Sequence, residues 1–127
     1  MAQLFLAIDF MHSKNIIHRD LKLENILLNS RDNGVLELRI ADFGLAKQLL
    51  PGEIDYHKCG TPTYIAPELL RGQGATIKSD IFGLGSIMFN LLTGRYLFNS
   101  RSSHELLQQN KDCKINLDVP ELKEVSP

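Results

Sequence analysis

The segment from Ser79 to Gly94, SDIFGLGSIMFNLLTG, constrains the fold more than any other, because it is apolar on nearly every face. Serine commonly caps the start of a helix, and glycine commonly follows its end. A helix that is apolar all round has to be covered by other elements. We therefore predict a buried central helix over residues 80–93, around which the rest of the chain packs.

Other segments predict shorter helices around this one. Apolar residues at helical spacing near the N-terminus predict an amphipathic helix that ends near Lys14–Asn15. Pro67 is suited to the first position of a short helix. Ser102 and Glu105 have the spacing of a capping box for one more helix.

One β-hairpin is predicted between the first two helices. Its strands are the short apolar runs Ile26–Leu28 and Val35–Ile40, and Asn33-Gly34 between them is a strong turn signal. The stretch from about residue 42 to 62 shows no clear periodicity and is predicted to be an extended loop. The chain is therefore expected to be mainly α with a small β-hairpin.

Composition excludes several classes of protein. The 127 residues carry a net charge of −1, so no long-range attraction to nucleic acid or to an anionic membrane is expected. No apolar run approaches the roughly 20 residues that span a bilayer. The N-terminal segment carries Asp9 and no basic region, which is unlike a signal peptide. Cys59 and Cys113 lack partner spacing, and we predict reduced thiols in an intracellular, cytoplasmic protein.

Candidate chemistry begins in IIHRDLKLENILL, residues 16–28, where Asp20, Lys22 and Asn25 fall within six positions between aliphatic pairs. A carboxylate can accept a proton, an ammonium group can neutralise a phosphoryl oxygen, and an amide oxygen can bind Mg²⁺. Taken alone, the stretch is equally compatible with a charged surface loop.

Two further stretches strengthen the catalytic interpretation. Asp42, in IADFGLA, lies at the end of the hairpin's second predicted strand. Asn25 and Asp42, one at each end of the hairpin, would form the small oxygen-ligand set that Mg²⁺ prefers. The third stretch is GTPTYIAPE, residues 60–68, which follows the long loop and opens a helix.

Together, H-R-D-L-K-x-x-N at 18–25, D-F-G at 42–44 and A-P-E at 66–68 resemble the eukaryotic protein kinase family in order and spacing. The resemblance covers nearly the whole chain and extends to SDIFGLG, although the family often has tryptophan where Phe82 stands. Lys22 resembles the serine/threonine kinases rather than the tyrosine kinases.

The resemblance implies a role for each matching residue. Asp20 would orient the substrate hydroxyl and accept its proton, and Lys22 would stabilise the transferring phosphoryl group. Asn25 and Asp42 would hold Mg²⁺ with ATP, and Thr61 would contact Asp20 and shape the groove for the protein substrate. The implied nucleotide-binding positions are Lys22, Glu24, Asn25, Leu27 and Asp42. The implied supporting positions are His18, Arg19, Phe43, Gly44, Glu68 and Asp80.

Some of these positions have a stated physical task in the family. Leu27 would lie under the adenine, His18 and Phe43 would stack in the hydrophobic spine of the active state, and Asp80 would anchor the catalytic loop's backbone. Glu68 would pair with an arginine much further along the chain, and the sequence contains no such arginine.

The sequence also departs from the family's pattern. We find no Gly-rich phosphate loop and no strand lysine of the V-A-I-K type. The expectation is therefore a partial kinase domain over residues 1–127, consisting of a kinase-like C-terminal lobe with the N-terminal lobe absent. An isolated chain of this kind is expected to be inactive.

Arg19 beside Asp20 is typical of kinases that are activated by a phosphate in the loop after D-F-G. That loop, Leu45 to Gly60, contains no serine or threonine, and Tyr56 is its only hydroxyl group. One hypothesis is that Glu53 or Asp55 supplies the negative charge permanently.

The leading function is ATP-dependent phosphorylation of serine or threonine residues in protein substrates by the parent protein. The first alternative is a catalytically inactive truncated kinase that binds proteins through Thr61–Glu68. The second is a small-molecule kinase of related fold, but such enzymes generally lack the A-P-E motif.

Overall fold

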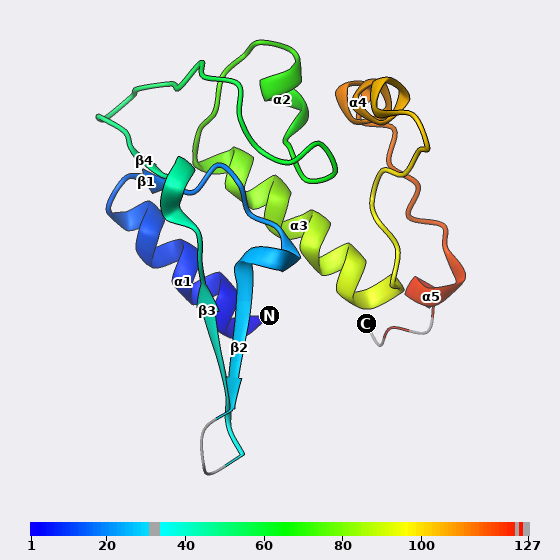
Figure 1. The fold of residues 1–127 in the computed structure, drawn as a ribbon, viewed down its shortest axis with the longest axis horizontal. Helices are drawn as coiled ribbons and strands as arrows, with labels where there is room; N and C mark the ends of the chain where they lie inside the picture. The colour runs from blue at the N-terminus through cyan, green and yellow to red at the C-terminus, as the bar shows by residue number, and fades with distance from the viewer. Residues whose placement is uncertain (31–33, 124, 126–127) are drawn as a thin grey trace.

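The computed structural model describes residues 1–30, 34–123 and 125. Its helices are α1 (Ala2–Ser13), α2 (Pro67–Leu70), α3 (Ile77–Thr93), α4 (Ser103–Asp112) and α5 (Pro120–Lys123). Its strands are β1 (Ile16–Ile17), β2 (Ile26–Ser30), β3 (Leu36–Ile40) and β4 (Lys47–Gln48), with 3₁₀ turns η1 (Leu23–Asn25) and η2 (Phe43–Leu45). Figure 1 shows α3 crossing the centre of the molecule. Within the described residues, every helix is too short or too polar to cross a membrane.

Helix α3 begins three residues earlier than the sequence predicted, at Ile77 rather than at residue 80. Its N-cap is Thr76, whose hydroxyl accepts a hydrogen bond from the Lys78 N–H at 3.2 Å. Ser79, the predicted cap, lies inside the first turn, and its Oγ accepts from the Thr76 N–H at 3.1 Å. The predicted end is confirmed, because Gly94 caps the helix with a φ of 68°.

The core forms on one side of α3. Leu84 and Ile87 pack there against Leu4 and Ile8 of α1. The prediction that the helix is buried on every face is wrong. The adjoining side leaves five large apolar residues exposed: Ile77, Ile81, Met88, Leu91 and Leu92. Met88 and Leu92 of this set line an apolar hollow of about 350 Å³. Periodicity could not separate the two sides because both are apolar.

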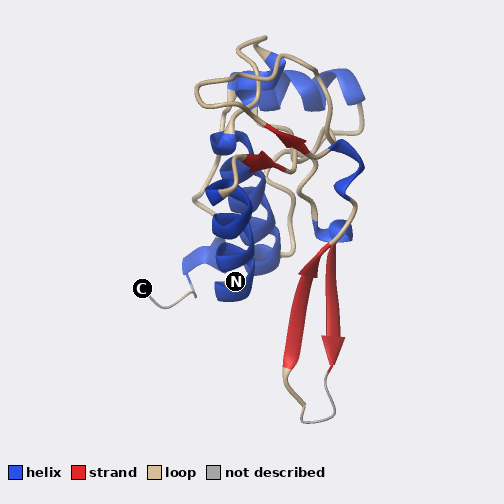
Figure 2. Ribbon diagram, turned by 90° about the vertical axis from the view of Figure 1, so that its left-hand side faces the viewer, coloured by secondary structure: helices blue, strands red, loops and turns tan. Residues whose placement is uncertain are grey.

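The predicted hairpin is present. β2 and β3 pair antiparallel, with Ile26 opposite Ile40 and Ser30 opposite Leu36. Figures 1 and 2 show the two strands side by side as a narrow ribbon. β3 stays in contact with α1, where Gln3 Nε2 donates to the Leu36 carbonyl at 2.9 Å and the Leu38 N–H donates to Gln3 Oε1 at 2.8 Å. Asn33 of the predicted turn lies outside the described residues. Asn25 and Ala41 stand at the base of the hairpin, where β2 begins and β3 ends.

The expectation of a single hairpin is corrected by a second two-stranded sheet. Strands β1 and β4 pair antiparallel, with Ile16 opposite Gln48 and Ile17 opposite Lys47. Each strand has only two residues, and β4 lies in the stretch predicted as loop. Elements this short give no periodic signal, and their pairing joins residues far apart in the sequence. The sheet fastens the stretch after Gly44 to the start of the 18–25 segment.

Candidate active site

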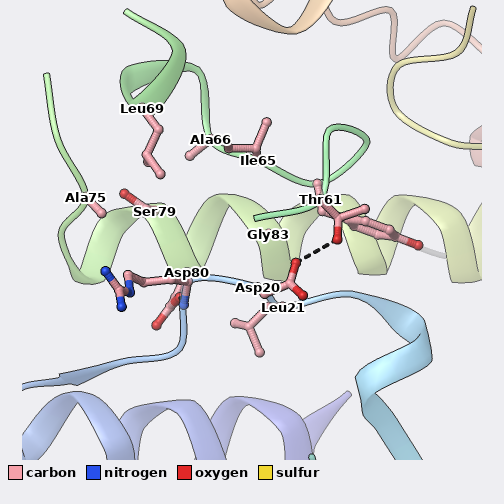
Figure 3. Close-up of a pocket in the computed structure, with 12 residues that line it drawn as sticks. Asp20, Leu21, Thr61, Ile65, Ala66, Leu69, Ala75, Ser79, Asp80 and Gly83 are labelled. Atoms are coloured by element: carbon pink, nitrogen blue, oxygen red, sulfur yellow. Dashed lines mark hydrogen bonds between the residues drawn. The ribbon is translucent and has the colours of Figure 1, made fainter. Parts of the chain in front are cut away.

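The backbone of the 18–25 segment is anchored by the side chain of Asp80 in α3. Asp80 is 3% exposed, and its carboxylate accepts hydrogen bonds from the backbone N–H groups of His18, at 2.8 Å, and Arg19, at 3.0 Å. His12 of α1 adds a third contact, with Nε2 at 2.9 Å from Asp80 Oδ2. Figure 3 shows Asp80 beside this segment, which crosses between α1 and α3.

The sequence interpretation missed the contribution of His12. The available signal was its position four residues after the buried Ile8, which places it on the core-facing stripe of α1. A polar residue on such a stripe needs a hydrogen-bond partner, because an unpaired polar group is costly to bury. Here the partner is Asp80.

Asp20, Lys22 and Thr61 form a closed triangle of hydrogen bonds. Thr61 Oγ1 donates to Asp20 Oδ1 at 2.7 Å, and Lys22 Nζ lies 2.9 Å from Asp20 Oδ2. Lys22 Nζ also donates to Thr61 Oγ1 at 3.0 Å. Figure 3 shows the side chains of Asp20 and Thr61 pointing toward one another, with their hydrogen bond dashed. The structure thus joins two segments that are 41 residues apart.

The contacts within the triangle shift the pKa values of Asp20 and Lys22. Burial alone would raise the pKa of Asp20, but hydrogen bonds from Lys22 and Thr61 and the charge of Lys22 outweigh it and hold the pKa below the usual 3.8. The hydrogen bond to Asp20 raises the pKa of Lys22 above its usual 10.5. At neutral pH the site therefore presents a carboxylate and an ammonium group side by side.

Asn25 and Asp42 come together at the base of the hairpin. The Ala41 N–H donates to the Asn25 carbonyl at 2.8 Å, which places Asp42 directly beyond this contact. Asn25 is 7% exposed and its Nδ2 donates to the Asp20 carbonyl at 3.0 Å. No described residue donates to Asn25 Oδ1, so this oxygen is available to a ligand. The exposed Asp42 has a φ of 59° and accepts from the Gly44 N–H at 3.3 Å.

These oxygens fit a magnesium ion. The described residues contain no group of three or more His, Cys, Asp or Glu side chains that would form an all-protein metal site. Mg²⁺ typically takes only one or two protein oxygens and fills the remaining positions with water and phosphate. The carboxylate of Asp42 and the amide oxygen of Asn25 are donors of this kind.

Arg19 joins the 18–25 segment to the loop after η2. Its guanidinium group forms an ion pair with Asp55, and its Nε donates to the Leu45 carbonyl at 2.5 Å. Lys47 Nζ lies 3.0 Å from Asp55 and 2.9 Å from Glu53. Of the two acidic residues considered in the sequence, Asp55 contacts Arg19 and Glu53 contacts Lys47. Tyr56, the other candidate in this loop, is exposed.

Asp55 is also fixed through its backbone. It exchanges two hydrogen bonds with Ala75, at 3.1 and 2.6 Å, just before α3. Its side chain is buried, and burial alone would raise its pKa. Hydrogen bonds and charges from Lys47 and Arg19 outweigh burial and lower the pKa below its usual value. The loop is thus tied to the 18–25 segment by charge and to the start of α3 by its backbone.

Replacing Asp55 by asparagine is expected to lower the free energy of unfolding at pH 7 by about 2 kcal/mol, between the values of exposed and buried ion pairs. Because its folded-state pKa is lowered, Asp55 stabilises the fold above its ordinary pKa, and this contribution disappears as pH falls through the folded value. The difference from wild type should therefore shrink below about pH 4. Urea unfolding at pH 7 and pH 3 measures it, with Glu53→Gln as the control. Equal stability at pH 7 would contradict the expectation.

The remaining predicted residues occupy three environments. His18 is fully buried, and Phe43 packs on its ring edge-on with centroids 5.1 Å apart. Leu27, on β2, and Glu24 are both exposed. Glu68, whose partner the sequence left open, accepts a hydrogen bond from Ser79 Oγ at 2.8 Å.

Comparison with known proteins identifies the family. The family model described as protein kinase domain matches residues 1–127. Serine/threonine-protein kinase ATG1c of Arabidopsis thaliana is 43% identical over 108 residues, which cover 85% of this chain and 15% of that protein. A probable serine/threonine-protein kinase 2 of Plasmodium falciparum is 38% identical over 119 residues, 94% of this chain and 23% of that protein. Serine/threonine-protein kinase atg1 of Dictyostelium discoideum is 41% identical over 117 residues, 92% and 17% respectively.

The chain therefore belongs to the protein kinase family. It spans less than a quarter of the length of these relatives. The match over residues 1–127 also corrects the sequence-based fold class, which assigned the chain to a C-terminal lobe alone with the N-terminal lobe absent. That prediction was wrong: it set a boundary from two missing short motifs, whereas the family match extends over every position of the chain.

Proposed function

We propose that the protein transfers the γ-phosphoryl group of ATP to serine or threonine hydroxyl groups of protein substrates. The observation that carries this proposal is the triangle of Asp20, Lys22 and Thr61, in which a carboxylate and an ammonium group are fixed within 3 Å of each other. The relatives described above carry the name serine/threonine-protein kinase, which supports the same substrate class.

In this proposal Asp20 orients the substrate hydroxyl and accepts its proton. Each of its oxygens receives one hydrogen bond in the structure, and a carboxylate has about four lone-pair sites, so a further donor can be accommodated. A bond forms between the hydroxyl oxygen and the γ-phosphorus while the bond to the β,γ-bridging oxygen breaks, and ADP leaves. The lowered pKa keeps Asp20 ionised and ready to accept a hydrogen bond from an incoming hydroxyl.

Lys22 supplies positive charge where the phosphoryl group passes. Its raised pKa keeps it protonated, and its contacts with Asp20 and Thr61 fix its ammonium group in place. Such preorganised charge stabilises a transition state without further rearrangement. Thr61 connects this chemistry to the 60–68 stretch, which would present the protein substrate.

Asn25 and Asp42 would hold Mg²⁺ with ATP through their oxygens. When bound, the ion neutralises charge on the phosphate oxygens of ATP. The 2.8 Å contact between Ala41 and Asn25 keeps these two ligands at one end of the hairpin. Glu24 and Leu27 are proposed to contribute to the nucleotide site from neighbouring positions.

Removal of divalent metal tests the proposal. The purified parent protein is incubated with radiolabelled ATP, MgCl₂ and a generic basic protein, with and without excess EDTA. We expect label on phosphoserine or phosphothreonine, reduced to background by EDTA, because Mg²⁺ is part of the proposed site. Label that persists in EDTA, or that appears only on phosphotyrosine, would contradict the proposal.

The same assay separates the alternative function. A protein that binds a basic protein substrate in a pull-down but transfers no phosphate would act as a binding module through Thr61–Glu68. The observation that favours keeping this alternative is the rigid anchoring of that stretch, which does not itself depend on ATP.

A further inference from the structure

Asn110 is a fully buried amide side chain near the end of α4, and no sequence motif pointed to it. Its Nδ2 donates to the carbonyl of Pro62 at 3.0 Å and to that of Ile65 at 2.8 Å. Both acceptors lie in the 60–68 stretch, 48 and 45 residues earlier in the chain. Figure 1 shows α4 on the far side of α3 from α1, near the loops that surround α2.

The arrangement fixes the orientation of the amide. Two carbonyl oxygens require two N–H donors, so the NH₂ group has to face the 60–68 stretch. Asn110 Oδ1 is then left buried without a hydrogen-bond partner among the described residues. Leaving Oδ1 buried without a partner costs free energy, and the two hydrogen bonds donated by Nδ2 are the contacts that offset this cost.

The two bonds bracket a turn that begins at Thr61. The Thr61 carbonyl accepts from the N–H groups of Tyr64 and Ile65, each at 2.9 Å. Asn110 holds the turn at Pro62 and at Ile65, while the Thr61 side chain holds Asp20. The position of Thr61 over Asp20 is thus determined from both sides, by the 18–25 segment and by α4.

We propose that Asn110 is a positioning residue for the protein substrate: it fixes the 61–65 turn in the shape that presents a substrate hydroxyl to Asp20. This inference rests on the proposed kinase function for its catalytic meaning. Asn110 does not touch the reacting atoms and acts through the backbone of Pro62 and Ile65. Its removal should therefore weaken use of the protein substrate more than use of ATP.

A merely structural role has to be distinguished. Arg71 also ties α4 to the neighbourhood of α2, because its Nε donates to the Lys111 carbonyl at 2.9 Å. If Asn110 only docked α4, loss of the Arg71 contact would have a similar effect. Gln109 is a matched control on the same helix, since its side chain makes no hydrogen bond to any described residue.

Hydrogen exchange tests the anchoring without any need for activity. Asn110→Leu removes both donors at similar volume, and we expect the amides of Tyr64 and Ile65 to exchange about tenfold faster than in wild type, since two hydrogen bonds are lost. Gln109→Leu and Arg71→Met should leave them within about twofold. Unchanged exchange in Asn110→Leu, or an equal increase in Arg71→Met, would overturn the proposal. If Asn110→Leu does not fold, Asn110→Ser, with a smaller apolar change, is measured in the same way.

Steady-state phosphorylation of a generic basic protein tests the functional part. In Asn110→Leu we expect KM for the protein substrate to rise about tenfold, while KM for ATP and kcat stay within about twofold. An equal rise in both KM values, or a fall in kcat alone, would overturn the positioning role. Absence of phosphorylation in wild type would count against the proposed function, and the exchange result would still decide whether Asn110 anchors the turn.

Discussion

Replacing Asp20 by asparagine is expected to lower kcat for protein phosphorylation by about 10³-fold, within the range typical of a lost general base. The amide retains the size of the carboxylate and an acceptor oxygen for Thr61, but its NH₂ group replaces the oxygen that Lys22 contacts, so the Thr61 contact is kept and the Lys22 contact is lost. It cannot accept the proton of the substrate hydroxyl, and it removes the negative charge beside Lys22. The loss should therefore appear in the chemical step rather than in folding.

The measurement is the initial rate with radiolabelled ATP at saturating protein substrate, together with thermal unfolding of both proteins. Asp9→Asn makes the same chemical change at an exposed position of α1 and should leave kcat within about twofold. A rate for Asp20→Asn within tenfold of wild type would rule out Asp20 as the proton acceptor.

Replacing Asp80 by alanine is expected to lower the free energy of unfolding by about 4 kcal/mol, since a buried acceptor of three hydrogen bonds is lost. The backbone N–H groups of His18 and Arg19 would remain buried without their partner. Stability and phosphorylation should fall together, because the same contacts fold the protein and place Asp20.

Two further variants are compared with Asp80→Ala, and the free energy of unfolding of each protein is measured in urea. Asp80→Asn keeps one acceptor oxygen but turns an NH₂ group toward a backbone donor, so about half of the loss is expected. Lys78→Ala changes an exposed residue of the same helix and should stay within about 0.5 kcal/mol of wild type. An Asp80→Ala protein as stable as Lys78→Ala would show that the 18–25 segment is anchored elsewhere.

Local features of the fold could be predicted from the sequence. The end of α3 at Gly94, the start of α2 at Pro67 and the pairing of β2 with β3 follow from signals within a few residues. The start of α3 could not be assigned, because both Thr76 and Ser79 are capping residues and the structure uses both hydroxyls at one end. The β1–β4 sheet was missed because its strands are too short to show a period.

The site shows the same division between local and distant signals. Asp20, Lys22, Asn25 and Asp42 could be proposed from the sequence because their chemistry is concentrated in short motifs. Their supporting contacts depend on segments that meet only in the folded chain. His12 carried only the signal of its helical spacing after Ile8, and Asn110 carried no recognisable pattern. The choice of Asp55 over Glu53 as the partner of Arg19 likewise depends on the backbone contact with Ala75.

The separation of these contacts along the chain has a consequence for folding. Asp20 meets Thr61 across 41 residues, and His18 meets Asp80 across 62, so large loops have to close before these two hydrogen bonds form. Closing a loop costs entropy that increases with its length, and distant contacts are typically formed late. The catalytic contacts should thus assemble together with the α1–α3 core rather than before it. Partly folded chains would then lack the aligned carboxylate and ammonium group, so the proposed phosphoryl transfer would be confined to the native state.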